Sequence, residues 1–428
     1  MEKKQGFFWF FKITLVLFFF GTCSLVAVAS GAFWHFSKDL PNIITVADYH
    51  PWLVTRVFAN LNEKTPELVG EFSIQKRYIV PYEKIPEHVI KAFISAEDDR
   101  FFEHSGINII SMIRASIANF KAGHVVQGGS TITQQVAKSL LLSSEKSFGR
   151  KIKEVMLAWK IEKNLTKEQI LFLYLNQIYL GHGAYGVQAA SEAYFNKDVT
   201  KLTLAEAAIL AGMPQAPGKY SPLLNPKRAK ERQLYVLKRM LENQFINSAQ
   251  MTSAAAQEIP VYEDQDVTKK YSTYYLDHVR KYLIEKYGED AVFKEGLTVF
   301  IPTTPQLLLS GRESLRRGLE AVDKRIGYRG PIQTLKDQKE IEAFLKKERL
   351  ELIDKRLGFK VLLPDGKIDR IAGLKMKSIL TDAQLLDPRE LYQAVVISID
   401  DLKKNVRVMI GGAPADLPLE KIKWAKKT

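Results

Sequence analysis

The spacing of apolar and polar residues changes character several times along this chain. Residues 13–34 contain no charged side chain, and a run of that length is enough for a helix to cross a bilayer. Residues 40–85 have an extended, turn-rich pattern punctuated by prolines. From Pro86 to about residue 245 the apolar positions recur with a helical period. The pattern therefore predicts a membrane-spanning helix, an extended linker and a mostly helical domain.

Several elements of the helical region can be placed from local signals. A helix that begins after Pro86 brings Glu97 to its C-terminal end. A second helix is expected at residues 107–122, and the helical pattern resumes after residue 147. Two capping boxes mark further helix starts: Thr166 with Gln169, and Thr203 with Glu206.

The last third of the chain has a mixed pattern. Helices are expected at 274–287, 305–322 and from 331 to about 356, with a strand at 297–301. Short alternating segments follow at 359–363, 368–372, 394–399 and 406–410. Strands of this length, separated by glycine, proline and aspartate, are typical of a small β-barrel or sandwich.

The charges that flank the apolar run predict its orientation. Lys3, Lys4 and Lys12 precede it, whereas Lys38 follows it and is balanced by Asp39. The positive-inside rule then places the N-terminus in the cytoplasm and the bulk of the chain outside the membrane. The small residues at 27–29 (Ala-Val-Ala) leave a cleaved secretory signal open as the alternative, and this too exports the bulk of the chain.

Composition narrows the class of partner. The chain has 428 residues, a net charge of +14 and a single cysteine, so no disulfide forms within it. The positive charge suggests an anionic partner, either acidic lipid or a phosphorylated substrate, or it is simply a solvated surface. No nucleic-acid-binding signature accompanies it.

Carboxylates and cations between residues 97 and 154 suggest a catalytic site. A carboxylate can act as a general base, and cations can stabilise a phosphate group that carries negative charge. Glu97 is the candidate base, and Glu154 lies one helical turn after Lys151, on the same face. A polar stretch between them follows Gly128-Gly129, but it lacks the Gly-Lys-Ser/Thr ending of a phosphate loop.

Five sequence blocks in order resemble the peptidoglycan glycosyltransferases, the polymerising half of class A penicillin-binding proteins. The blocks are Glu97-Asp98-Asp99-Arg100-Phe101-Phe102-Glu103-His104-Ser105-Gly106, Gly128-Gly129-Ser130-Thr131-Ile132-Thr133-Gln134-Gln135 with Lys138, Arg150-Lys151-Ile152-Lys153-Glu154, Tyr174-Leu175-Asn176 with Gly181-His182-Gly183-Ala184-Tyr185-Gly186, and Ala211-Gly212-Met213-Pro214-Gln215-Ala216-Pro217. The resemblance is strong to about residue 245 and moderate after it.

The resemblance implies roles for individual residues. Glu97 becomes the catalytic base that acts on the acceptor 4-hydroxyl, and Glu154 becomes the second essential carboxylate. The residues implied in substrate binding are Asp98, Ser130, Thr131, Gln134, Gln135, Lys138, Lys146, Arg150, Lys151 and Asn176.

Other features of these blocks have two readings. No metal-ligand spacing occurs among the seven histidines, and only the family analogy suggests a divalent cation (Mg²⁺ or Mn²⁺) on the diphosphate through Asp98. His104 either holds the Glu97 loop or transfers protons, with the first reading favoured. The apolar faces at 109–117 and 140–142 either dip into the membrane or belong to an ordinary core.

The chain departs from the family pattern at three positions. Phe172 stands where a glutamate is usual, Asn196 replaces a glycine, and Lys146 replaces an arginine. The Ser-x-x-Lys, Ser-x-Asn and Lys-Thr-Gly motifs of the transpeptidase domain are also missing in their expected places. The resemblance thus implies a 1A-type protein whose chain stops before that domain.

The expected fold is mainly α, a lysozyme-like domain after one transmembrane helix, followed by an α+β linker and a small OB-like barrel. The predicted ranges are 1–36 (cytoplasmic tail and anchor), 37–85 (extended linker), 86–245 (glycosyltransferase domain), 246–330 (linker region) and 331–428 (all or part of the barrel).

The predicted activity is polymerisation of lipid II into β-1,4 glycan strands at the bacterial cytoplasmic membrane, with release of undecaprenyl diphosphate. The expected partners are lipid II, the growing strand, the membrane and cell-wall synthesis proteins bound by the barrel, with no nucleic acid. Two alternatives stay open. One is a glycan hydrolase, against which the cation cluster weighs; the other is an impaired envelope scaffold, which Phe172 favours and the intact Glu97 and Glu154 oppose.

Overall fold

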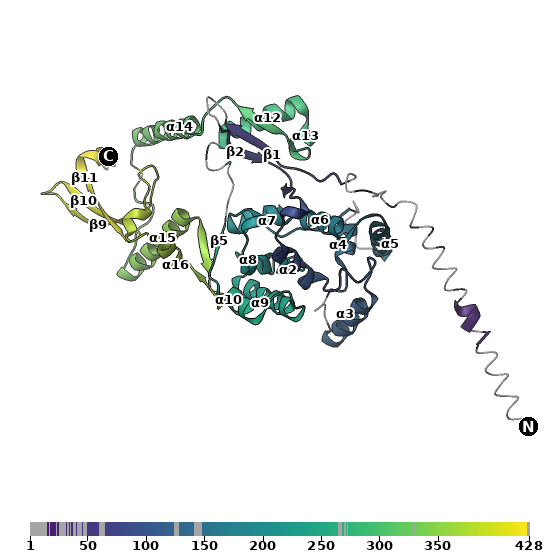
Figure 1. Ribbon diagram of the computed structural model, residues 1–428. Helices are drawn as coiled ribbons and strands as arrows, with labels where there is room; N and C mark the ends of the chain where they lie inside the picture. The colour runs from purple at the N-terminus through teal and green to yellow at the C-terminus, as the bar shows by residue number, and fades with distance from the viewer. Residues whose placement is uncertain are drawn as a thin grey trace, which may run out of the picture. The chain divides into compact units, whose positions relative to one another are not determined.

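The computed structural model describes residues 15–16, 18–22, 24, 31, 34, 36, 40, 45, 49–59, 65–123, 128–140, 148–263, 268, 271, 273–328 and 330–425. Helices dominate the described chain, as the sequence predicts (Figure 1). The chain divides into two compact units, one of residues 1–50 and 97–178 and the other of residues 51–96 and 179–428. We describe each unit by itself.

The first unit is built around three helices. They are α4 (Ile132–Leu140), α5 (Phe148–Asn164) and α6 (Lys167–Gln177), and each packs on the other two. Figure 1 shows the three side by side. Ile132, Leu157, Ile161 and Leu171 are fully buried among them. The predicted capping box of Thr166 and Gln169 is present at the start of α6, which confirms that helix start.

A fourth helix of this unit, α3 (Ile109–Ala122), differs from the other three. Asn108 caps its N-terminus by accepting a 2.9 Å hydrogen bond from the Ser111 amide, and Gly123 ends it in the left-handed conformation. Its apolar side chains are largely exposed: Ile109, Ile110, Ile113, Ile117 and Phe120. The helix therefore does not use this face to build the core of the described unit.

The second unit begins with a sheet that joins distant parts of the chain. Its strands β2 (Glu67–Phe72), β1 (Thr55–Ala59) and β6 (Thr298–Ile301) lie in that order, with β1 antiparallel to β2 and parallel to β6. One face packs against α12 (Thr273–Tyr287), α13 (Glu289–Phe293) and α14 (Pro305–Ile326) through a shared apolar core. The predicted linkers 37–85 and 246–330 therefore share one sheet.

The second unit also contains a group of helices on either side of residues 97–178 in sequence. They are α2 (Glu87–Glu97, whose last residue belongs to the first unit), α7 (Val187–Phe195), α8 (Leu204–Gly212), α9 (Pro226–Glu242) and α10 (Ser248–Ala256). A two-stranded parallel pair, β3 (Lys76–Arg77) with β4 (Ala184–Tyr185), lies beside α7. The capping box of Thr203 and Glu206 begins α8 as predicted.

The C-terminal region contains two further three-stranded sheets. One has the order β5 (Ile259–Tyr262), β7 (Phe359–Leu362) and β8 (Ile368–Asp369); the other has the order β11 (Ala413–Pro418), β10 (Asn405–Ile410) and β9 (Val395–Asp400). Helices α15 (Gln338–Leu357) and α16 (Ala372–Met376) accompany them, and short 3₁₀ turns occur at 82–84, 199–201, 382–385 and 419–425. The predicted short strands are thus present, but within residues 330–425 they do not close into a barrel.

The predicted transmembrane helix is not seen in the described chain. Across the described ranges, no helix is both long enough and apolar enough to cross a bilayer. Many residues of the predicted span, 13–34, lie outside those ranges.

The second unit holds a carboxyl group whose titration gives a testable pH dependence. Burial raises the pKa of Glu192 on α7, and the negative charge of Glu71 adds to this, while the hydrogen bond from Gln188 and the charges of Lys76 and Arg56 oppose it. The folded state therefore binds this proton more tightly than the unfolded chain does, so stability falls as pH rises above the ordinary carboxyl value of 4.5.

We expect Glu192→Gln to flatten this dependence, because the substituted side chain no longer titrates. Thermal melting of both proteins in detergent between about pH 5 and pH 7 measures the slope. The exposed Glu168 supplies a control, since Glu168→Gln should keep the wild-type slope. Identical slopes for wild type and Glu192→Gln would contradict the assignment.

Candidate active site

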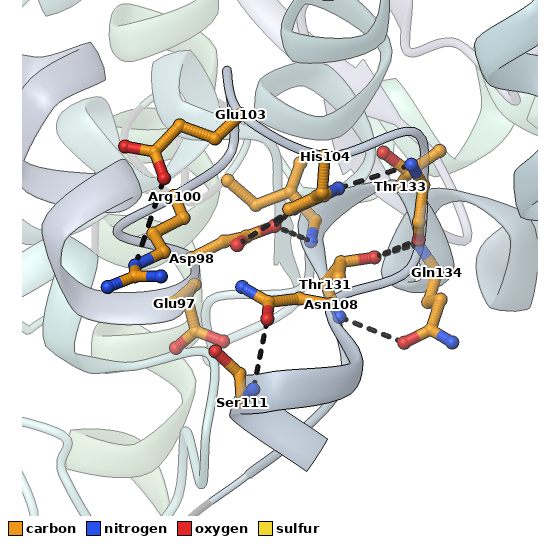
Figure 2. Close-up of polar contacts among 12 residues, drawn as sticks. Glu97, Asp98, Arg100, Glu103, His104, Asn108, Ser111, Thr131, Thr133 and Gln134 are labelled. Atoms are coloured by element: carbon orange, nitrogen blue, oxygen red, sulfur yellow. Dashed lines mark hydrogen bonds and ion pairs between the residues drawn. The ribbon is translucent and has the colours of Figure 1, made fainter. Parts of the chain in front are cut away.

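Glu97 is the last residue of α2, and its side chain is partly buried. Its Oε2 accepts a 2.8 Å hydrogen bond from Nε2 of Gln135 on α4. In Figure 2 the Glu97 carboxylate points away from the neighbouring Asp98 side chain. A carboxylate that is oriented by an amide donor is suited to act as a general base.

Asp98 is buried and has a different environment. Its Oδ2 accepts the backbone N–H of Ile132, at the start of α4, at 3.0 Å, and both carboxylate oxygens lie 3.0–3.1 Å from Nε2 of His104. The Gly106 amide donates to Nδ1 of His104. Because that nitrogen is the acceptor, Nε2 carries the hydrogen that Asp98 receives. His104 therefore holds the loop, as the favoured sequence reading expects (Figure 2).

Thr131 and Gln134 form a capping box at the N-terminus of α4. The backbone N–H of Gln134 donates to Oγ1 of Thr131, and Oε1 of the Gln134 side chain accepts a hydrogen bond from the backbone N–H of Thr131. The Thr131 hydroxyl donates in turn to the Gly106 carbonyl at 2.7 Å. Thr131 is 2% exposed and Gln134 is 0% exposed. These contacts give both side chains a structural role at the start of α4.

The sequence could have revealed this cap. Thr131-x-x-Gln134 is the same pattern as Thr166-x-x-Gln169, which predicts the start of a helix. The neighbouring Gly128 and Gly129 and the hydroxyl-rich composition favoured a ligand-binding reading instead.

Lys151, Glu154 and Ser130 lie together, as the spacing of the first two predicts. The Lys151 ammonium donates to a Glu154 carboxylate oxygen and, at 3.1 Å, to Oγ of Ser130. The Lys151 side chain is 43% exposed, whereas that of Glu154 is 4% exposed. A buried carboxylate thus fixes an ammonium group that still faces solvent, an arrangement suited to binding phosphate oxygens.

The other predicted site residues are placed as follows. Lys138, in the last turn of α4, is exposed, and Arg150, in the first turn of α5, is partly buried. Asn176 is 0% exposed, and its amide donates to the Phe172 carbonyl within α6 at 2.9 Å. Lys146 and residues 141–142 lie outside the described residues.

Phe172, which replaces the family's usual glutamate, is packed against another aromatic ring. Tyr49 meets it edge to face, with 6.4 Å between ring centroids, and the Tyr49 hydroxyl donates to Gln177 at 2.7 Å. Phe172 therefore packs Tyr49 against α6. Glu97 and Glu154 have hydrogen-bond partners although no glutamate stands at position 172.

Tyr174 is a residue of this site that sequence reasoning did not single out for a role. It is 1% exposed, and burial raises the pKa of its phenol well above the ordinary value, with the negative charges of Glu97 and Asp98 adding to the effect. The phenol therefore stays protonated and neutral. Its sequence motif does not reveal these charges, because Glu97 and Asp98 lie on a distant segment of the chain.

Asp98 does not fit the divalent cation that the family analogy suggested. Its carboxylate is 6% exposed and already accepts from His104 and from the amide of Ile132. Within the described ranges, no three His, Cys, Asp or Glu side chains gather into a metal site made of protein ligands alone.

Comparisons with known proteins agree on one family. The transglycosylase family profile matches residues 65–241. Penicillin-binding protein 1A of Aquifex aeolicus is 41% identical over 344 residues, which cover 79% of this chain and 46% of that protein. Penicillin-binding protein 1A of Rickettsia bellii is 34% identical over 427 residues, which cover 99% of this chain and 48% of that protein.

The crystal structure of penicillin-binding protein 1A from Haemophilus influenzae aligns with a TM-score of 0.46 at 22% identity, over 89% of this chain and 41% of that one. The chain spans about half the length of the curated relatives it matches. It belongs to the transglycosylase family and carries that family's domain between residues 65 and 241.

Proposed function

We propose that this chain is a membrane-anchored peptidoglycan glycosyltransferase that polymerises lipid II into β-1,4 glycan strands. The observation that carries the proposal is the Glu97 carboxylate, oriented by Gln135, in the same unit as the Lys151–Glu154 pair. The family match of residues 65–241 and the relatives named penicillin-binding protein 1A support it.

In the proposed reaction Glu97 removes the proton from the 4-hydroxyl of the acceptor sugar. The resulting oxygen attacks C1 of the donor, and the bond from C1 to the diphosphate oxygen breaks, so undecaprenyl diphosphate leaves with the electron pair. Attack from the face opposite the leaving group converts an α-linked donor into a β-1,4 product. Lys151, Arg150 and Lys138 are the cations assigned to the developing negative charge.

The buried residues of the site act through these groups. Glu154 holds the Lys151 ammonium in place. Asp98 and His104 fix the loop after Glu97, and Thr131 and Gln134 cap the helix that carries Gln135. Of the predicted binding residues, Ser130, Gln135, Lys138, Arg150 and Lys151 are therefore the ones that we assign to substrate.

The exposed apolar face of α3 supports action at a membrane surface. Ile109, Ile113 and Phe120 are 66%, 56% and 89% exposed, and their spacing places them on one side of the helix. Within the described residues this face is exposed, so it does not form part of an ordinary core. A lipid surface would cover it and would bring the site to a polyprenyl substrate. The N-terminal anchor and a cytoplasmic N-terminus remain part of this proposal.

The first test is polymerisation of fluorescent lipid II by the full chain in detergent. We expect Glu97→Gln to lower the rate by roughly 10²–10⁴-fold, since the amide cannot accept the proton. Glu103→Gln is the matched control, because Glu103 is exposed in the same loop and pairs with Arg100 (Figure 2). Equal rates for wild type and Glu97→Gln would remove Glu97 from the mechanism, and lack of product from the folded wild type would favour the scaffold reading.

A second comparison separates substrate contact from helix capping. Lys138→Ala should raise the KM for lipid II and leave the melting temperature unchanged, because the side chain is exposed. Thr131→Val should lower stability by about 1 kcal/mol through loss of the cap, with little change in KM. A raised KM with unchanged stability in Thr131→Val would return Thr131 to the substrate-binding set.

A third comparison tests the membrane face. Ile113→Glu should raise the KM for long-chain lipid II in vesicles several-fold, because a carboxylate opposes insertion. Activity on a short-chain, water-soluble analogue should be unchanged. A similar effect on both substrates would argue against membrane contact by α3.

A further inference from the structure

A second ion pair lies beside the loop that holds Asp98 and His104. Lys167 Nζ, at the start of α6, is 2.8 Å from Oε1 of Glu162, near the end of α5, and the side chains are 23% and 7% exposed. Surface pairs contribute little to stability, whereas breaking a mostly buried pair leaves an uncompensated buried charge and is strongly destabilising.

The Lys167 ammonium reaches the loop through two further contacts. It donates to the backbone carbonyl of His104 at 2.6 Å. It also lies 4.4 Å from the centroid of the Phe101 ring, which is fully buried. One cation thus holds two points of the segment that follows Glu97.

The Glu162 carboxylate reaches the other loop of the site. Its Oε1 accepts a 2.6 Å hydrogen bond from the hydroxyl of Thr133, on α4 next to the cap residues. The first loop also lies directly on α5: a Cβ added to Gly106, whose φ is +90°, would be 3.0 Å from the Ala158 carbonyl oxygen and from Cγ of Glu162.

Loop 98–106 and α4, the two segments that define the position of Glu97, therefore both contact the Glu162–Lys167 ion pair. The loop 98–106 fixes the backbone after Glu97, and α4 supplies Gln135, which holds its carboxylate. We propose that Glu162 and Lys167 are positioning residues for the Glu97 base, and that their pair sets the distance between loop 98–106 and α4. The inference rests on the proposed transferase activity and adds two residues that do not touch the reacting atoms.

A positioning role and a merely structural role differ in what they change. If the pair only adds stability, its loss lowers the melting temperature while each folded molecule keeps its turnover rate. If it sets the place of the base, its loss lowers kcat with little change in KM, because substrate binding by Lys138 and Lys151 is untouched. Small displacements of reacting groups lower rates by up to about a hundredfold.

The test uses the full chain in detergent with Lys167→Met, which keeps the length of the side chain and removes its charge. We expect a fall in kcat on the order of ten- to a hundredfold with KM within about twofold. Hydrogen exchange should also speed up at the amides of Gly106 and Ile132, which donate to His104 and Asp98. Lys163→Met is the matched control, since Lys163 is exposed on α5 and lies over the Trp159 ring.

Thr133 provides a gentler pair of variants if Lys167→Met does not fold. Thr133→Val removes the hydroxyl at nearly constant volume, whereas Thr133→Ser retains it, so only the first should lower kcat. Unchanged kcat and unchanged amide exchange in the Lys167 or Thr133→Val variants would overturn the inference. A wild-type chain without polymerase activity would count against the proposed function, whereas the exchange measurement would still decide whether the pair holds the two segments.

Discussion

The burial of the Asp98 carboxylate at the N-terminus of α4 is the constraint on which the rest of the site depends. A carboxylate removed from water needs several donors, and here they come from the amide of Ile132 and from the His104 ring. The same helix end offers unpaired amides and a positive dipole, so the anion and the helix satisfy one another. Because Asp98 follows Glu97 directly, the hydrogen bonds that hold the Asp98 carboxylate also fix the backbone position of Glu97.

This arrangement explains why two adjacent acidic residues have opposite properties. Asp98 is almost fully buried, whereas Glu97 is only partly buried and its carboxylate accepts a hydrogen bond from the side-chain amide of Gln135. The Lys151–Glu154 pair also combines a buried group with a more exposed one. Here the Glu154 carboxylate is buried, and the Lys151 side chain that it holds is partly exposed to solvent. In each case a buried anion fixes the position of a less buried group.

The sequence predicted features that depend on near neighbours. The shared face of Lys151 and Glu154, the capping boxes of α6 and α8, and the position of Glu97 at a helix end all follow from spacings of three or four residues. Burial was harder to predict, because Thr131, Gln134 and Asn176 are polar and nothing local shows that the fold encloses them. The charge environment of Tyr174 and the Glu162–Lys167–His104 contacts required segments far apart in the chain to be brought together.

The sheet of β2, β1 and β6 has a consequence for how the chain is made. The amide of Leu297 binds the hydroxyl of Thr55 across 242 residues of sequence, and β1 runs parallel to β6. Bringing such distant segments together is slow, since chain entropy is lost before any contact forms. During synthesis β1 emerges long before β6. The edge of β1 that pairs with β6 therefore stays unpaired while the intervening helices form. Completion of this sheet is therefore a late event in the maturation of the chain, and a chain interrupted before residue 298 would leave that edge unpaired.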